Sequence, residues 1–226
     1  MKSRLVVFAL ISFVWLSCEK DDDNVDCVST QDPDGSVNGN GGNDSFEYVN
    51  SIGSYWVYQW YKVPYDGMES QLTRTDSIWI AGDTLINGNE YAVLKGTFYA
   101  GPEFTRFERD SSGYIINHRG DIFWSYTNFT DTLNTGFNGV WDYYTKMESS
   151  YVTFTPVGPF VAIKRNLHLY YTSGEPANQC GEDQITLTQS YASGVGLVKE
   201  QLGYAGPLTA CANYDEARLT DYYIAP

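Results

Sequence analysis

The sequence has few basic residues and few histidines. It holds 14 Lys and Arg against 28 Asp and Glu, which gives a formal net charge of −14, and it contains 2 His. A nucleic-acid-binding protein is expected to carry a basic stripe, and electrostatic attachment to anionic lipid needs clustered Lys and Arg. The composition therefore argues against nucleic acid as a partner and against a membrane contact made by charge.

Long hydrophobic runs are also missing. The apolar stretch Leu5–Leu16 is interrupted by Ser12 and is too short to cross a bilayer as a helix, which takes about 20 residues. It follows Lys2 and Arg4, which is the layout of a secretory signal peptide. We therefore predict a signal peptide over residues 1–17.

The residues around the first cysteine resemble the lipobox of bacterial lipoproteins. Ser17 precedes Cys18, although Trp15 stands where the lipobox commonly has Leu. An acylated Cys18 would anchor the protein to a membrane without a spanning helix. The acidic run in 19–23 resembles the surface-export signal of Bacteroidota lipoproteins, which implies the outer membrane and a position facing the cell exterior. The alternative is an ordinary secreted protein with a chance cysteine near its cleavage site.

The segment that follows is poor in residues that could form a core. Residues 18–45 are rich in Asp, Asn and Gly, and such a chain cannot offset its ordering entropy by burial. We predict a flexible acidic tether that holds the next domain about 30 Å from the membrane. Residues 46–226 are long enough for one buried core and are predicted to form one β-domain.

No window of the sequence shows a long helical period, and the residue choice favours strands. There are 19 Tyr, 11 Phe and 6 Trp, and aromatic residues fit the half-buried surface of a sheet. Asn87-Gly88 between apolar runs is a hairpin signal. Residues 160–171 alternate with a period of two, with Arg165 as an exception on the apolar side.

We therefore predict an all-β fold: a single antiparallel curled sheet or a partly open β-barrel of roughly ten strands. A short helical turn is expected over 214–219.

Cysteine usage fits export. Cys180 and Cys211 would meet an oxidising compartment and are predicted to form a disulfide, which would stabilise the fold by about 3–4 kcal/mol. The state of Cys27 in the tether is open: it is free, pairs with another molecule, or replaces one of these two partners.

Three stretches carry a family resemblance: 53–58 (GSYWVY), 139–141 (GVW) and 191–199 (YASGVGLVK). They resemble the DUF3108-like family of exported β-proteins, which is related in fold to the LolA/LolB lipoprotein carriers. The resemblance implies a curled antiparallel sheet. It implies no reaction, because a fold of this kind is a scaffold.

Catalytic patterns are sparse. His118 and His168 are accompanied by no Gly-x-Ser-x-Gly elbow and no third zinc ligand. Asp142, Glu148 and Glu103 could supply a pair of glycosidase carboxylates, but so acidic a chain contains many chance pairs. We predict no enzymatic activity, no metal site and no cofactor.

Aromatic rings are the better indication of binding, because exposed planar rings stack on sugar faces or line grooves for apolar ligands. The alternative is that they fill the core of a small barrel. The tentative ligand-binding residues are Trp56, Tyr58, Trp60, Trp79, Trp124 and Trp141.

Three Asp-Ser/Thr-Ile/Leu triplets resemble the O-glycosylation motif of Bacteroidota exported proteins. They make Ser77, Thr84 and Thr132 tentative glycosylation sites.

The leading hypothesis is a non-enzymatic surface lipoprotein whose β-domain binds glycan or an envelope protein. One alternative is a carrier of lipid or another apolar ligand in a curled-sheet groove, and another is a glycosidase-like enzyme. An exposed aromatic strip would favour the first, an apolar cavity the second, and two close carboxylates the third.

Overall fold

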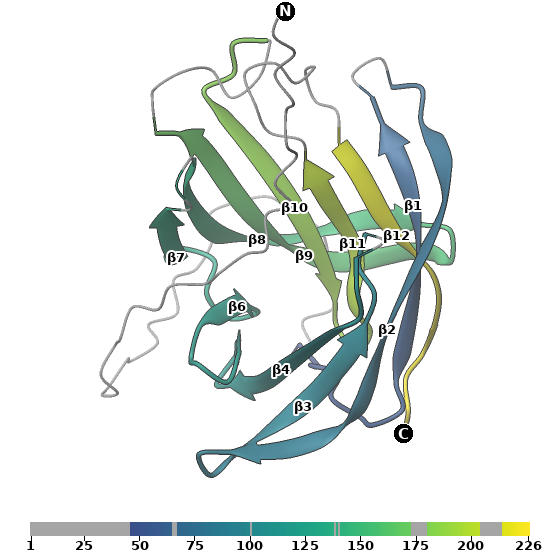
Figure 1. Cartoon of the computed structure of the whole chain (residues 1–226), viewed down its shortest axis with the longest axis vertical. Coiled ribbons are helices and arrows are strands. Elements are labelled where there is room, and N and C mark those ends of the chain that lie inside the picture. Colours follow the sequence, from purple (N-terminus) through teal and green to yellow (C-terminus); the bar gives the residue numbers. More distant parts are fainter. Residues whose placement is uncertain are drawn as a thin grey trace, which may run out of the picture.

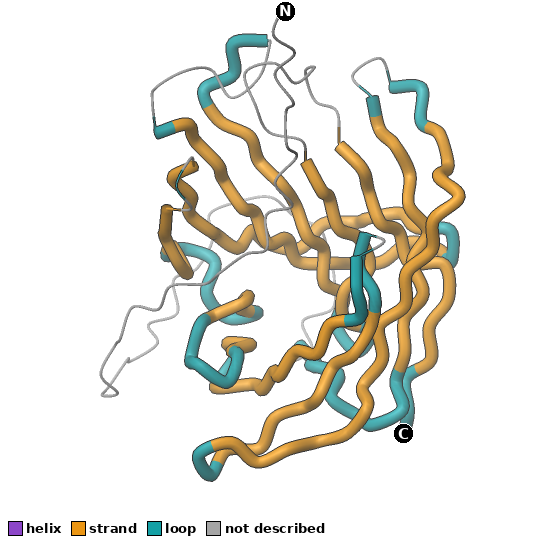
Figure 2. The backbone as a smooth tube through the Cα atoms, in the orientation of Figure 1, coloured by secondary structure: helices purple, strands orange, loops and turns teal. Residues whose placement is uncertain are grey.

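The computed structural model describes residues 46–64, 67–99, 101–137, 139, 141–172, 180–203 and 214–226. The predicted signal peptide (1–17), Cys18, the tether (18–45) with Cys27, and Cys211 lie outside these residues and stay predictions. The described residues contain strands and no helix (Figures 1 and 2).

The strands are β1 (Tyr55–Val63), β2 (Ser70–Ile86), β3 (Asn89–Gly96), β4 (Phe104–Ser111), β5 (Tyr114–Ile116), β6 (Ile122–Ser125), β7 (Thr132–Phe137), β8 (Trp141–Thr155), β9 (Gly158–Tyr171), β10 (Gln184–Ala192), β11 (Gly196–Gly203) and β12 (Tyr214–Tyr223).

All strands belong to one 12-stranded antiparallel sheet that curls into a nearly closed barrel (Figure 1). Its spatial order is β6-β5-β4-β3-β2-β1-β12-β11-β10-β9-β8-β7, so the first and last strands pair and the chain follows the barrel wall. The two sheet edges, β6 and β7, meet where the Asn134 amide donates to the carbonyl of Ile122 at 3.1 Å. The predicted all-β fold and antiparallel curled sheet are confirmed, with twelve strands in place of about ten.

Local sequence explains several of these elements. Trp56, Tyr58 and Trp60 alternate along β1 and are all buried inside the sheet, as a strand with one core face requires. Asn87 and Gly88 have φ of 52° and 81°, the positive values that a tight hairpin turn needs, and they join β2 to β3. The predicted hairpin at this position is confirmed.

The barrel is filled by side chains from every part of the wall. The main cluster joins β1, β2, β3, β11 and β12, and its fully buried members include Trp60, Ile80, Val198 and Leu219. A second cluster lies between β8 and β9, and a third joins β5 and β6 to the inner side of β8 and β9. Apolar burial of this kind is the main stabilising contribution to the fold.

The β8–β9 hairpin continues past the barrel wall as an arm, residues 149–161. The ladder of β8 with β7 ends at Lys146, and that of β9 with β10 ends at Ala162. The arm crosses the outside of β11 and β12 (Figure 1). Its inner side is fastened by the Tyr151 hydroxyl, 2.5 Å from Ser190 Oγ, and by Phe160, whose ring lies 6.2 Å from that of Tyr222.

The first described residues close one end of the barrel. The Phe46 ring packs on Trp124 at 5.5 Å, and the Glu47 carbonyl accepts from Gly194 in the β10–β11 turn at 2.9 Å. Gly194 and Gly196 have φ of 68° and 97°, which glycine adopts without strain. These two glycines therefore allow the tight turn between β10 and β11.

The structure corrects two expectations, at residues 214–219 and at Val161, and places Arg165 on the apolar side as its position in the alternation predicts. Residues 214–219 belong to β12 instead of a helical turn, because the strand pairs with both β1 and β11. Val161, expected on the core side, is 68% exposed because β9 has left the barrel wall at that point. Arg165, the exception in the alternation, points inward and is buried, where its guanidinium donates to the carbonyl of Phe123 and to Gln189.

Candidate functional site

The six rings proposed from sequence as a binding surface are mostly in the core. Trp56, Tyr58, Trp60, Trp124 and Trp141 are buried, at 5% exposure or less. Trp79 is half-buried and alternates with the core residues of β2, so it belongs to the outer face. The five buried rings cannot stack on a ligand at the surface, and the prediction that they form an exposed strip does not fit their burial.

A different set of aromatic side chains faces outward on β7, β8 and β9. Tyr144 stands opposite Thr135 on β7 and His168 on β9. Two residues earlier in β8, Asp142 stands opposite Phe137 on β7 and Tyr170 on β9. Their chain neighbours Tyr143 and Leu169 are buried, so the period of two places these side chains on the outer face. We call Thr135, Phe137, Asp142, Tyr144 and Tyr170 the aromatic face.

The rings of the aromatic face hold each other in place. Tyr144 stacks on His168 with centroids 4.4 Å apart and on Tyr170 at 5.8 Å. Phe137 on the edge strand β7 is 51% exposed. Stacked cross-strand pairs fix the rings at little entropic cost on binding, so this surface is preformed.

An open depression of about 400 Å³ lies at the aromatic face, lined by Thr135, Gly136, Phe137, Asp142, Tyr143, Tyr144 and Tyr170. Typical small-molecule sites are concave and bury most of the ligand, whereas this depression is open to solvent, so a ligand on it would stay partly exposed. The lining offers apolar ring surface together with hydroxyl and carboxylate groups.

Two titratable groups at the aromatic face, Tyr170 and His168, have pKa values shifted toward their neutral forms. Burial, with a hydrogen bond to Tyr144, raises the pKa of Tyr170 to about 12. Burial also lowers the pKa of His168, against the opposing influence of Glu148. His168 Nδ1 lies 3.0 Å from Thr186 Oγ1 and 2.9 Å from Gln184 Nε2. Neutral donors and acceptors of this kind suit an uncharged polar ligand.

Two of the three carboxylates proposed for glycoside hydrolysis, Asp142 and Glu148, are too far apart to act as a pair. Asp142 and Glu148 lie on one strand, separated by about 20 Å at the strand rise of ~3.3 Å per residue, whereas a glycosidase pair is about 5–9.5 Å apart. Glu103 precedes β4 on an exposed segment. Within the described ranges, no three His, Cys, Asp or Glu side chains form a group that could hold a metal ion.

Several polar side chains that face the barrel interior contact one another. The Arg106 guanidinium lies 2.5 Å from Glu108, and Arg165 donates to Gln189, which donates to Glu200 at 2.5 Å. Burial raises the pKa of Glu200 and lowers that of Arg165. The Gln189 amide therefore links these two groups, whereas the hydroxyl of the buried Thr145 has no hydrogen-bond partner among the described residues.

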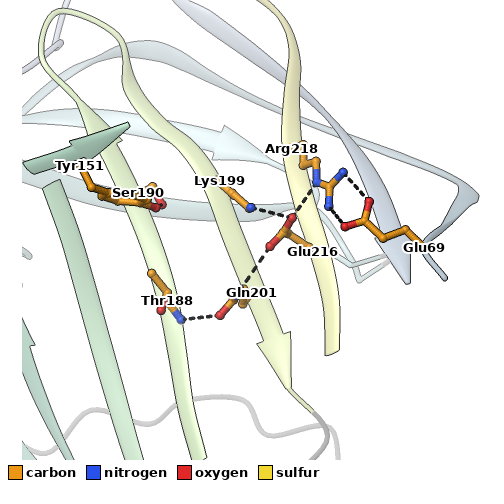
Figure 3. Close-up of polar contacts among 8 residues, drawn as sticks. All are labelled: Glu69, Tyr151, Thr188, Ser190, Lys199, Gln201, Glu216 and Arg218. Atoms are coloured by element: carbon orange, nitrogen blue, oxygen red, sulfur yellow. Dashed lines mark hydrogen bonds and ion pairs between the residues drawn. The ribbon is translucent and has the colours of Figure 1, made fainter. Parts of the chain in front are cut away.

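A second network lies on the outer face of β10, β11 and β12 (Figure 3). Glu216, with 1% of its side chain exposed, accepts from Lys199 at 2.9 Å and from Arg218 at 2.6 Å. Arg218 also makes two hydrogen bonds to Glu69, which lower the pKa of that carboxyl. Ser190, beside Tyr151 in the same view, is buried under the arm, so a substrate cannot reach it as a nucleophile.

The tentative modification and disulfide residues differ in accessibility. Thr132 is exposed at the start of β7, whereas Ser77 and Thr84 are half-buried in β2. Cys180 is exposed and disulfide-bonded. Its predicted partner Cys211 lies outside the described residues, so the pairing stays a prediction.

The sequence held a usable signal for the aromatic face that was not recognised. Trp141, Tyr143 and Thr145 alternate with Asp142 and Tyr144, a strand pattern with aromatic residues on both sides. Which side meets solvent depends on the partner strands, and sequence alone did not place them.

Comparison with known proteins finds no matching family model and no matching curated protein. The DUF3108-like resemblance is therefore not confirmed.

Two solved structures are similar in fold. One, from Bacteroides fragilis, is described as an exported protein with a YmcC-like fold; it shares 14% identity, covers 79% of this chain and 99% of its own, with a TM-score of 0.47. The other, from Parabacteroides distasonis, is described as a lipoprotein; it shares 13% identity, covers 80% and 100%, with a TM-score of 0.45. Likenesses at this level carry no conclusion about what this chain binds.

Proposed function

We propose that this protein is a lipid-anchored component of the bacterial outer membrane, facing the cell exterior, whose β-domain binds carbohydrate at the aromatic face without catalysing a reaction. The anchor rests on the lipobox-like sequence at Cys18 and the acidic run after it. The ligand class rests on the open depression between Phe137, Tyr144 and Tyr170.

Carbohydrate fits this surface for a chemical reason. A sugar ring has an apolar C–H face that packs on aromatic rings and hydroxyl groups that need hydrogen-bond partners. Phe137 and the Tyr144–Tyr170 pair supply ring surface, and Asp142 and Thr135 supply an acceptor and a hydroxyl. Asp142 and Glu148 stand about 20 Å apart along β8, well beyond the spacing of a glycosidase pair, and this is why we favour binding over hydrolysis.

The test is saccharide binding by the mature chain, residues 18–226, on an array of gluco-, galacto- and manno-configured oligosaccharides, followed by calorimetry with the best-bound one. Tyr144→Ala and Phe137→Ala are each expected to weaken binding at least tenfold. Phe129→Ala is the matched control, because Phe129 is an exposed ring outside the depression. No binding at millimolar saccharide, or equal affinity for all four proteins, would contradict the proposal.

The lipid anchor and the position on the cell surface are tested separately. Cys18→Ala is expected to remove the acyl mass from the chain and to move most of the protein out of the membrane fraction, because acyl chains hold a lipoprotein on the bilayer more tightly than a small surface contact does. Protease treatment of intact cells then reports whether the wild-type domain faces outward. An unchanged mass for Cys18→Ala would contradict the anchor.

The carrier hypothesis has weaker support. It needs an enclosed apolar space, and the depressions that stand out in the described part of the chain, at the aromatic face and beside 72–75, are both open to solvent. Trp60, Ile80 and Leu219 fill the barrel interior instead. Native mass spectrometry of the chain released from its own cells is the measurement that would revive it, through a lipid mass lost on denaturation.

A further inference from the structure

The arm presents a second exposed surface, distinct from the aromatic face. Val152 stands opposite Val161, and Phe154 opposite Pro159. Phe154 and Val161 are 70% and 68% exposed, while Thr153 on the other side is buried against the barrel. Residues 149–161 contain no charged side chain. The outer side of the arm is therefore an apolar, uncharged sheet face, which soluble proteins rarely leave without a partner.

Amphipathic rings lie on the outer face of the barrel near the end that the arm contacts. Tyr55 on β1 pairs with Tyr223 on β12 and with Trp79 on β2, so three rings form a row across neighbouring strands. Tyr222, which pairs with the buried Trp56 and so lies on the other face of β12 from Tyr223, contacts Phe160 and places the arm at this end of the barrel. Tyr and Trp are the residues that gather at the boundary between water and lipid, because their rings have one apolar and one polar end.

The chain outside the described residues points to what covers this surface. Between Cys18 and Phe46 there are at most about 100 Å of fully extended chain, and an unstructured chain of this composition would average about 30 Å. Phe46–Ser54 crosses the barrel end where β1 begins at Tyr55 and β12 finishes at Tyr223. The anchored end and the aromatic row thus belong to the same end of the barrel.

We infer that the outer side of the arm, with the row of Tyr55, Tyr223 and Trp79, docks on the surface of the lipid bilayer that holds the anchor. The inference rests on the anchoring part of the proposed function. A domain kept this close to the bilayer meets it at an effective concentration on the order of millimolar, so a contact that is occupied at millimolar lipid is strong enough to orient the anchored domain. Because the acidic chain gains nothing from anionic lipid, burial of apolar side chains carries the contact. Docking would fix the orientation of the aromatic face relative to the membrane.

The test uses the mature chain with Cys18→Ser, which lacks acyl chains and so reports the surface alone. It is floated with vesicles of pure phosphatidylcholine at millimolar lipid. We expect a measurable bound fraction that falls at least fivefold in the double variant F154S/V161T. Leu85→Ser is the matched control, since Leu85 is 74% exposed on the β2–β3 hairpin, and it is expected to bind as the parent does. Thermal unfolding of each variant checks that folding is intact.

Three results would overturn the inference. They are no flotation of the parent, flotation that F154S/V161T leaves unchanged, and a concentration-dependent dimer in sedimentation that the same double variant abolishes, which would assign the surface to a second copy. Acylation of Cys18 is read independently from the mass of the chain made in cells, so failure of the anchor and failure of the docking surface are told apart.

Discussion

The phenol ring of Tyr144 on β8 stacks on the imidazole of His168 on β9, with centroids 4.4 Å apart and planes inclined by 20°. The two residues are far apart in the sequence and meet only because β8 and β9 pair in this register. The pair orders one side of the aromatic face, and its chemistry makes that face sensitive to pH.

Burial lowers the pKa of His168 below its ordinary value, which is about 6.5 in an unfolded chain. The unfolded state therefore binds the proton more readily than the folded state does. The stability from a neutral His168 is complete above about pH 6.5 and is lost as pH falls through the lower folded pKa. We expect His168→Gln to show a smaller drop in unfolding free energy than the wild type on acidification. Urea unfolding across a pH series measures this, and parallel pH profiles for the two proteins would contradict it.

Loss of the buried carboxylate of Glu216 is expected to lower the free energy of unfolding more than loss of the exposed carboxylate of Glu69. Glu216→Gln leaves Lys199 and Arg218 with a neutral partner in a buried site, and breaking a buried pair costs about 3 kcal/mol or more. Glu69→Gln removes the exposed partner of Arg218 and should cost less than about 1 kcal/mol. Chemical denaturation of both variants provides the comparison, and equal losses would show that burial does not set the strength of this network.

Gly96 in β3 has no room for a side chain. A Cβ there would lie 2.3 Å from the Ser77 carbonyl oxygen and 2.9 Å from Ile78 Cα, both of them backbone atoms that cannot rotate away. We expect Gly96→Ala to destabilise the fold by about 2–3 kcal/mol. Gly82→Ala, in the adjacent strand with nothing within 4 Å of its added Cβ, is the control and should be nearly neutral. Thermal melts of the two variants measure the difference. Similar melting temperatures for Gly96→Ala and Gly82→Ala would contradict the predicted clash at Gly96.

The predicted Cys180–Cys211 bridge has a specific signature. If the two residues are partners, Cys180→Ser, Cys211→Ser and the double variant should each lose the same ~3–4 kcal/mol, because one bond is lost in all three. Peptide mapping without reductant identifies the partner directly. A mapped bond from Cys180 to Cys27, or additive losses, would replace the predicted pairing.

Much of the fold was predictable because its cause is local. The alternation of Trp56, Tyr58 and Trp60 and the turn at Asn87-Gly88 depend on residues a few positions apart, and the predicted turn is confirmed. Residues 214–219 were predicted as a helical turn. They form a strand because they pair with residues distant in sequence, and local propensity does not report such pairing.

At the candidate site, too, the residue types were predictable from the sequence and their exposure was not. Residue types alone pointed to aromatic rings, but they favoured Trp56, Trp60 and Trp124, which the barrel buries. Val161 lies in the arm, where β9 has left the barrel wall, and its side chain faces solvent. Arg165 lies in the part of β9 that belongs to the wall, and its side chain faces the barrel interior.

The sequence by itself determined the all-β class, the acidic surface and the expectation of a lipid anchor, because composition, strand periodicity and a short N-terminal motif are local properties. Tertiary structure alone decided which of two aromatic sides on each strand meets water. A strand with rings on both sides has no intrinsic inside; closure of the sheet assigns one side to the core and leaves Phe137, Tyr144 and Tyr170 at the surface.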